Sequence, residues 1–309
     1  MTLNIGLLGI LCLSALPSAT LSNAHDNTET KDGYKMVWHD EFDGDSLDTR
    51  AWNIEVGGNG NGNAELEYYT DNASNISLGM EPVSGEHCLI ITARREEYNG
   101  KSFTSGRINT CDKVHFTRGK IESRIKFPKT ANGLWPAFWL LGNDYKENGW
   151  PRCGEIDILE MGHTDGIKLG LQDRYFNGAC HWGFYKDSNY PNYAKATANR
   201  YPLQDDEFHT FTLEWDKSFI CMYLDKEQYP DAEPYYKIGV SETSDEWSTG
   251  NYFHHDFFVL FNLAVGGWFT GILAPDGITA LKEGEEARMY VDWVRLYQKT
   301  NEVNATIPL

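Results

Sequence analysis

The sequence predicts an all-β protein, a sandwich of antiparallel sheets, and two observations carry that prediction. Aromatic residues make up 14% of the 309-residue chain and 29 residues are glycine, a composition that favours strands and turns over helices. Short β-prone segments are separated by turns rich in Gly and Asn. After residue 24, no stretch of useful length has apolar residues at the helical period. The length is compatible with one large β domain or two small domains.

The first 24 residues are predicted to be a signal peptide, and residues 25–33 a polar linker. An apolar run from Ile5 to Leu16 precedes the small-residue stretch Ser22–Ala24. No Lys or Arg precedes the run, which is unusual for a signal peptide, so a buried N-terminal helix and a membrane anchor are the alternatives. The run is short for a membrane span. We expect a secreted protein, located outside the cell, in the periplasm or at the cell surface.

The strands of the predicted domain, residues 34–299, follow one another in short steps. A strand begins at Tyr34, and a Gly/Asn loop at residues 57–63 leads to the next one. The segment 120–127 alternates strictly, with Ile121 and Ile125 on one face and Lys120 and Lys126 on the other, which predicts a strand with one face in water. Residues 163–206 are expected to be rich in loops, and residues 300–309 to form a tail. Further strands are predicted at 87–96, 208–215, 218–225, 257–269 and 289–297.

Charge and cysteine content narrow the class of partner. The net charge of −18 would repel nucleic acids and polyanionic substrates, and it fits a soluble protein that acts on a neutral polymer. Five cysteines follow residue 24, and none is in a C-x-x-C spacing, which argues against a thiolate metal site. They allow one disulfide or none.

The segment Gly154–His163, GEIDILEMGH, contains the candidate catalytic residues. In an extended strand Glu155 and Asp157 point to the same face, but the third acid, Glu160, arrives one position out of phase. A single-residue β-bulge between Asp157 and Glu160 would place all three acids on one face. Like charges so close are costly unless a carboxyl holds a proton or solvent is near, and carboxyls with separated pKa values are what glycoside hydrolysis needs. The alternative is a solvated acidic strand face.

Aromatic residues on both sides of the acids favour a sugar-binding cleft. Trp135, Trp139 and Trp150 lie just upstream, and His181 and Trp182 just downstream. Indole rings stack on the C–H faces of sugar rings. Of the other tryptophans, Trp268 is a further candidate for stacking, whereas the core is the expected place of Trp38, Trp52 and Trp293.

Together, WPAFWLLG and GEIDILE resemble glycoside hydrolase family 16, in its laminarinase-like branch of endo-β-1,3-glucanases and β-1,3-1,4-glucanases. The resemblance extends over about residues 34–298. It implies a β-jelly roll, a sandwich of two curved antiparallel sheets with a concave substrate cleft. It also implies a retaining mechanism, with Glu155 as the nucleophile, Glu160 as the general acid/base and Asp157 as the residue that tunes them.

The same resemblance implies a set of residues that bind substrate. Asn53 would line the glycone end of the cleft, Arg107 would hydrogen-bond sugar near the cleavage point, and His181 would lie near the acid. A surface salt bridge for Arg107 and a core position for His181 are the alternatives. The expected substrate-binding residues are Asn53, Arg107, Trp135, Trp139, Trp150, His181 and Trp268.

Catalysis needs no cofactor in this family, but a structural calcium ion is common. The positions that match its ligands are Glu41, the carbonyl group of Gly85, and Asp292, and oxygen ligands suit calcium. The expected partner is a β-glucan, met by a monomer with no membrane span and no nucleic acid. The rival interpretations are a hydrolase of agarose, porphyran or carrageenan, a transglycosylase, and a non-catalytic glucan-recognition protein. Intact Glu155 and Glu160 argue against the last of these.

Overall fold

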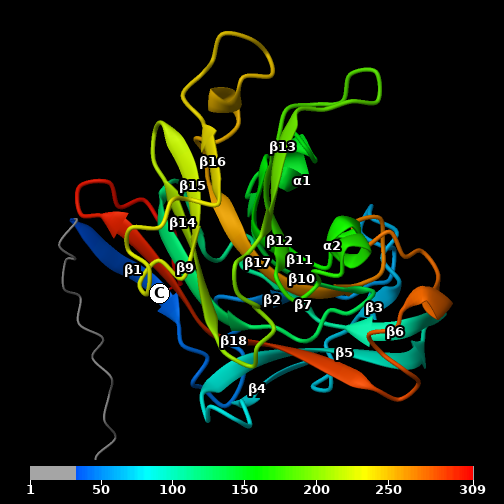
Figure 1. The fold of residues 1–309 in the computed structure, drawn as a ribbon. Coiled ribbons are helices and arrows are strands. Elements are labelled where there is room, and N and C mark those ends of the chain that lie inside the picture. Colours follow the sequence, from blue (N-terminus) through cyan, green and yellow to red (C-terminus); the bar gives the residue numbers. More distant parts are fainter. Residues whose placement is uncertain (1–32, 309) are drawn as a thin grey trace, which may run out of the picture.

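The computed structural model describes residues 33–308, which form two β-sheets packed face to face (Figure 1). The ten-stranded sheet has the order β16-β15-β14-β9-β18-β5-β6-β3, with β1 beside β18 and β4 beside β5. Its strand pairs are antiparallel apart from the parallel pair β3 and β6. Its strands are β1 (Tyr34–Asp40), β3 (Glu67–Tyr69), β4 (Ile76–Met80), β5 (His87–Tyr98), β6 (Lys101–Ser105), β9 (Gly119–Lys126), β14 (His209–Trp215), β15 (Phe219–Leu224), β16 (Tyr236–Gly239) and β18 (Glu286–Lys299).

The eight-stranded sheet has the order β13-β12-β11-β10-β17-β7-β2, with β8 beside β17. It holds the acidic motif in β11, between β10 and β12. Its strands are β2 (Asn53–Ile54), β7 (Arg107–Asn109), β8 (His115–Phe116), β10 (Leu134–Gly142), β11 (Glu155–Met161), β12 (Tyr175–His181), β13 (Asn192–Ala198) and β17 (Phe257–Val265). Four short helices lie in the connections: α1 (Tyr145–Asn148), α2 (Thr164–Leu169), η1 (Thr249–Asn251) and η2 (Pro275–Gly277). The all-β sandwich predicted from the sequence is confirmed.

The main hydrophobic core lies between the two sheets. Strict alternation fills it: Ile121 and Ile125 of β9 point inward, as do Phe138 and Leu140 of β10. Strand β17 is buried along its whole length because its two faces lie in different environments. One face joins this core, and the other packs in a second cluster that contains Cys111, Leu141, Cys153, Phe258 and Leu260.

Residues 163–206, expected to be rich in loops, also contain α2, β12 and β13, and an edge strand such as β13 needs few apolar side chains. Two expectations about individual side chains are wrong. Lys126 was expected in water, yet it is 6% exposed because it pairs with buried Glu81. Trp293 was expected in the core, yet it is only partly buried and its ring packs under the guanidinium group of Arg295.

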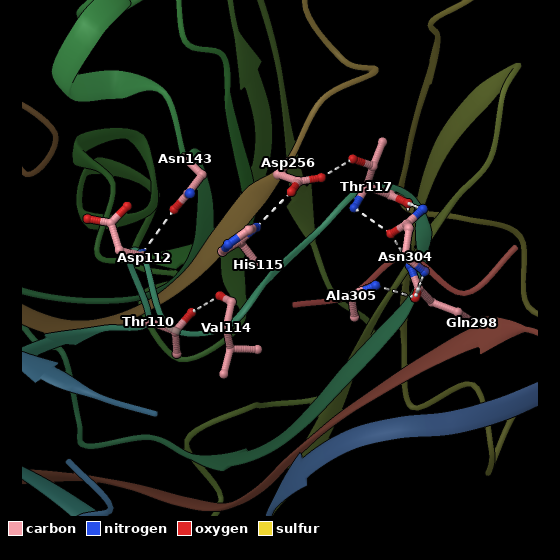
Figure 2. Close-up of polar contacts among 10 residues, drawn as sticks. All are labelled: Thr110, Asp112, Val114, His115, Thr117, Asn143, Asp256, Gln298, Asn304 and Ala305. Atoms are coloured by element: carbon pink, nitrogen blue, oxygen red, sulfur yellow. Dashed lines mark hydrogen bonds and ion pairs between the residues drawn. The ribbon is translucent and has the colours of Figure 1, made fainter. Parts of the chain in front are cut away.

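The C-terminal segment packs back onto the domain (Figure 2). The side chain of Asn304 accepts a hydrogen bond from the backbone N–H of Thr117 at 3.1 Å and donates to the carbonyl of Thr117 at 2.8 Å. Thr306 forms a backbone bridge with His115, whose ring contacts Asp256 at 2.7 Å. Residues 304–306 are therefore attached to the sheet that carries β8.

The signal peptide and most of the linker predicted from the sequence lie outside the described residues. No helix within residues 33–308 is long and apolar enough to cross a membrane. All five cysteines of that part of the chain are free thiols.

Candidate active site

Strand β11 contains the β-bulge that the acid spacing predicts. Against β12, Asp157 pairs with Ala179 and Glu160 pairs with Asn177, so that two residues of β11 face the single residue Gly178. Against β10 the register also shifts at this point. The extra residue restores the phase of the strand, as the sequence required.

The bulge directs the three acids away from the core. Glu155 and Glu160 are half-buried and Asp157 is 4% exposed. The apolar residues of the same strand belong to the core between the sheets: Ile156, Ile158, Leu159 and Met161. One strand therefore supplies both a hydrophobic face and the whole acidic motif.

Burial raises the pKa values of all three carboxyls, and repulsion by neighbouring acids adds to the rise for Glu155 and Glu160. Burial, followed by the charge of Asp157, raises the pKa of Glu155 to about 8. Burial raises the pKa of Asp157 to about 8. For Glu160, burial followed by the charges of Asp157 and Glu155 raises the pKa well above its ordinary value. The cluster therefore retains protons at neutral pH and titrates as a unit.

Neighbouring donors distinguish Glu155 from Glu160. Glu155 accepts a hydrogen bond from the indole N–H of Trp150 at 3.1 Å, and the charges of His181 and Arg107 favour its ionised form. Glu160 accepts from the indole N–H of Trp135 at 3.0 Å, and the charge of His181 favours its ionised form as well, but burial keeps its pKa well above the ordinary value. Of the two glutamates, Glu155 is therefore the more favourable site for negative charge, and Glu160 retains its proton better.

His181 lies beside the predicted nucleophile. The resemblance placed it near the acid, but the structure pairs it in register with Glu155. Its Nε2 atom is 3.3 Å from Oδ2 of Asp157 and 4.0 Å from Oε1 of Glu155, and its Nδ1 atom is 3.1 Å from the hydroxyl of Tyr190. Because it contacts two of the acids, its placement favours the site over the core position that was the alternative.

Arg107 of β7 packs over Trp139, and its charge lowers the pKa of Glu155. Its Nε atom is 2.8 Å from Oε2 of Glu55, and its guanidinium group lies 4.9 Å from the ring centroid of Trp139. Asn53 donates to Oδ1 of Asn109 at 3.1 Å, and Asn109 donates to Glu55 at 2.7 Å. Arg107 thus forms an ion pair, which was the alternative to sugar binding. The pair lies beside the candidate active site and not on a distant surface.

A cavity of about 330 Å³ adjoins this group and is lined by Glu55, Arg107 and Asn109. Two larger cavities, of about 600 and 620 Å³, lie around Tyr201 and Tyr229, and none of the three cavities is lined by Glu155, Asp157 or Glu160. The site is therefore located by the acids and their hydrogen-bond partners, and the 330 Å³ cavity is attached to it through Arg107.

The predicted aromatic residues are not all equivalent. Trp135 and Trp150 bond directly to acids, and Trp139 donates to Asn262 at 2.8 Å while its ring packs under Arg107. Trp268 is 64% exposed, and its backbone N–H donates to the carbonyl of Asn63 at 2.8 Å. Trp268 is thus a surface ring beside the Gly/Asn loop.

Sequence reasoning missed three residues of the site. Tyr190 contacts His181, and its ring meets that of Trp150 edge-on at 4.8 Å. Phe269 stacks on Trp135 at 4.6 Å, and Glu55 pairs with Arg107. The tyrosines at 185 and 190, a few residues after His181, were the feature of the sequence from which Tyr190 could have been inferred.

Arginine side chains hold both carboxylates of the predicted calcium site. Arg295 donates to both oxygens of Glu41, at 2.9 and 2.7 Å, and Arg124 donates to Asp292. The charge of Glu41 is among the causes that raise the pKa of Asp292, after burial, so the two carboxylates share one region. The donor set has the oxygen chemistry that calcium prefers, but an ion would have to displace two guanidinium groups. Calcium binding therefore stays a prediction.

Comparisons with known proteins agree with the site. The model of "Glycosyl hydrolases family 16" matches residues 65–241. The chain is 31% identical to a beta-glucanase of Rhodothermus marinus over 88% of both chains. It is 36% identical to a glucan endo-1,3-beta-glucosidase of Cryptopygus antarcticus, over 76% of this chain and 82% of that one. The clotting factor G alpha subunit of Tachypleus tridentatus is 32% identical over 86% of this chain, which spans only 34% of that relative.

A solved structure extends the agreement to three dimensions. It is the GH16 of the Bacteroides ovatus mixed linkage glucan PUL (MLGUL) in complex with G4G4G3G product, and it is 36% identical to this chain. The superposition has a TM-score of 0.73 and covers 84% of this chain and 100% of the other.

Proposed function

Because this chain belongs to glycosyl hydrolases family 16, we propose that it is a retaining endo-β-glucanase. Its substrates are β-glucans such as laminarin, cleaved at internal β-1,3 or mixed β-1,3-1,4 linkages. The observation that carries the proposal is the bulge in β11, which brings Glu155, Asp157 and Glu160 to one face beside indole donors.

The proposed reaction has two displacements at the anomeric carbon. In the first, the carboxylate of Glu155 attacks while the carboxyl of Glu160 gives its proton to the leaving glycosidic oxygen. The glycosidic C–O bond breaks and a glycosyl ester forms on Glu155. In the second, the carboxylate of Glu160 takes a proton from water, which displaces Glu155 and restores the original configuration. The difference between the environments of Glu155 and Glu160 supports this division of roles.

Asp157 and His181 are proposed to tune the nucleophile. Asp157 lies between the two catalytic residues in the chain and contacts His181 at 3.3 Å. Its burial favours a proton on Asp157, which leaves the negative charge of the cluster to Glu155.

Secretion, a monomeric state and a structural calcium ion are further parts of the proposal. The apolar run at the N-terminus supports secretion, and its loss from the mature protein is checked by N-terminal sequencing of the exported product. Sedimentation measures the oligomeric state. Calcium at Glu41, Gly85 and Asp292 predicts that a chelator lowers the melting temperature, whereas an unchanged melting temperature would leave Arg295 and Arg124 as the partners of the carboxylates.

Product analysis on laminarin, lichenan, agarose and carrageenan in parallel tests the activity. We expect oligosaccharides from laminarin or lichenan, with products of the β configuration at the earliest times. Products from agarose alone would favour the galactan alternative, and chain lengthening without net hydrolysis would indicate a transglycosylase. Binding of glucan without cleavage would leave only a recognition protein.

A further inference from the structure

A buried tyrosine of the ten-stranded sheet contacts the catalytic strand. Tyr235 directly precedes β16, its backbone N–H donates to the carbonyl of Met222 at 3.0 Å, and it is 9% exposed. Its hydroxyl donates to the carbonyl oxygen of Ile158, which lies within the bulge of β11. This hydrogen bond connects the two layers of the sandwich at the point where the acidic strand departs from regular geometry.

The bulge leaves Ile158 without a partner on β10. Phe138 pairs with Leu159 and the next residue, Trp139, pairs with Asp157, so the register passes over Ile158. An extra residue in a bulge drops out of the ladder, and its buried peptide group needs another hydrogen-bond partner. The hydroxyl of Tyr235 meets that need for the carbonyl group.

The packing around Tyr235 fixes its ring in this position. Its ring meets those of Phe176 and Phe211 edge-on, at 4.9 and 6.5 Å. Gly178 lies opposite the bulge, and a Cβ atom there would be 2.9 Å from Sδ of Met222 and 3.1 Å from Cε2 of Tyr235. The absence of a side chain at Gly178 therefore lets the tyrosine ring approach the strand.

We propose that Tyr235 is a positioning residue, which holds the bulge so that Glu160 joins Glu155 and Asp157 on one face. The carbonyl of Ile158 belongs to the peptide group that joins it to Leu159, directly before Glu160. Rotation of that peptide group would turn the side chain of Glu160. Burial raises the pKa of Tyr235 well above its ordinary value, so its hydroxyl keeps its proton and remains a donor at neutral pH. The inference rests on the proposed retaining function.

The neighbouring residue supplies a matched control. Tyr236 is fully buried, and its hydroxyl donates to the carbonyl of Tyr193 in β13 at 3.0 Å, not to the bulged strand β11. Tyr235→Phe and Tyr236→Phe therefore each remove one buried hydroxyl from adjacent positions. A role in stability alone predicts similar losses for both, whereas a role in positioning Glu160 predicts a loss of acid catalysis for Tyr235→Phe alone.

For each variant, the experiment compares kcat/KM on a β-glucan with kcat/KM on the dinitrophenyl glycoside of a β-gluco-oligosaccharide. Both values report the steps up to formation of the glycosyl-enzyme, and dinitrophenolate leaves without a proton from Glu160. For Tyr235→Phe we expect kcat/KM on β-glucan to fall by about 10- to 100-fold, mainly through kcat. We expect kcat/KM on the aryl substrate to change by less than about twofold, since that step needs little acid catalysis. Tyr236→Phe should behave as the wild type on both.

A second variant, Gly178→Ala, approaches the same contact from β12 and should show the same substrate-selective fall. The inference is overturned if Tyr235→Phe cleaves β-glucan like the wild type, if both substrates are affected equally, or if Tyr236→Phe shows the same selective fall. A wild-type protein that cleaves neither substrate would instead contradict the proposed function.

Discussion

Two groups of buried carboxylates in this sandwich have opposite electrostatic environments. In β11, burial raises the pKa values of Glu155 and Asp157 to about 8, and the charge of Asp157 adds to the rise for Glu155. At the ten-stranded sheet, the pKa values of Glu81 and Glu41 are lowered to about 2. All four are removed from water to a large extent, so burial alone does not explain the difference.

The difference lies in the partners. Burial pushes the pKa of Glu81 upward, but backbone N–H groups of Val83 and Ser84 and the ammonium group of Lys126, at 3.0 Å, outweigh it. Arg295 does the same for Glu41 with two hydrogen bonds. The acids of β11 have indole donors and a shared histidine but no such cation in contact with each carboxylate. A buried carboxylate with such partners stays ionised, and removal of a partner destabilises the fold, whereas the acids of β11 retain protons that a reaction can use.

The largest expected effect comes from Glu155→Gln. An amide cannot form the glycosyl ester, so kcat on β-glucan should fall by about 10⁴ or more. Because the amide carries no charge among the acids, the melting temperature at pH 8 should not fall. Near-normal turnover would remove Glu155 from the nucleophile role, and strong destabilisation would contradict the comparison.

Lys126→Met should have the converse effect, a loss of stability without a loss of catalysis. It leaves Glu81 buried without its cation, which costs about 3–5 kcal/mol of unfolding free energy. Urea denaturation measures the loss, and kcat is measured where the variant stays folded. The double variant Glu81→Gln with Lys126→Met is the control and should recover part of the loss. A single variant that loses less than about 1 kcal/mol would place this pair with ordinary surface ion pairs.

The two groups should also give opposite pH dependences of stability. For Asp157 and Glu155 the folded state binds protons more tightly than the unfolded chain, so their contribution falls as the pH rises from about 4 to about 8. For Glu41 and Glu81 the contribution is complete above the unfolded pKa near 4.5 and is lost as the pH falls toward 2.

Asp157→Asn tests the first of these slopes. The variant should gain stability relative to the wild type as the pH rises, by at least about 1.4 kcal/mol at pH 8, the equivalent of one pKa unit. Urea denaturation at pH 4, 6 and 8 measures the difference. If the unfolding free energies of the wild type and the variant change with pH in parallel, Asp157 does not retain a proton in the folded state.

The smallest effect is expected for the exposed ring Trp268. Trp268→Ala should weaken oligosaccharide binding by about 1 kcal/mol, the scale of one aromatic stacking contact, with an unchanged melting temperature.

Trp150→Ala should weaken binding similarly and also remove a donor to Glu155. The loss of this donor raises the pKa of that carboxyl and moves the acid limb of the kcat/KM profile to higher pH. Calorimetry and pH–rate profiles separate the two. A lower melting temperature with normal binding would make Trp268 structural.

Local spacing in the sequence predicted the sandwich, the bulge and the three acids. The phase of Glu160 relative to Asp157 is a property of a few consecutive residues, so it could be inferred without the fold. Likewise, the alternation in 120–127 predicted the strand that became β9.

Contacts between distant segments could not be predicted in the same way. The pairing of Lys126 with Glu81 brings together residues 45 positions apart. Phe269, in the loop that follows β17, stacks on Trp135 near the start of β10. Strand β12 was missed because Gly178 and its polar neighbours look like loop, although the glycine serves the bulge opposite it. The partners that separate the two groups of carboxylates are thus the part that needed the structure.

The most direct test of the proposed mechanism is the configuration of the product formed by Glu160→Ala in the presence of azide. This variant should not cleave β-glucan, whose leaving group needs a proton, but Glu155 should still attack an aryl glycoside with an activated phenol. Azide should then displace Glu155 from the glycosyl-enzyme, restore turnover and yield a β-glycosyl azide, which proton NMR identifies. An α-glycosyl azide would mean that azide entered directly, without a glycosyl-enzyme, and would contradict the retaining mechanism.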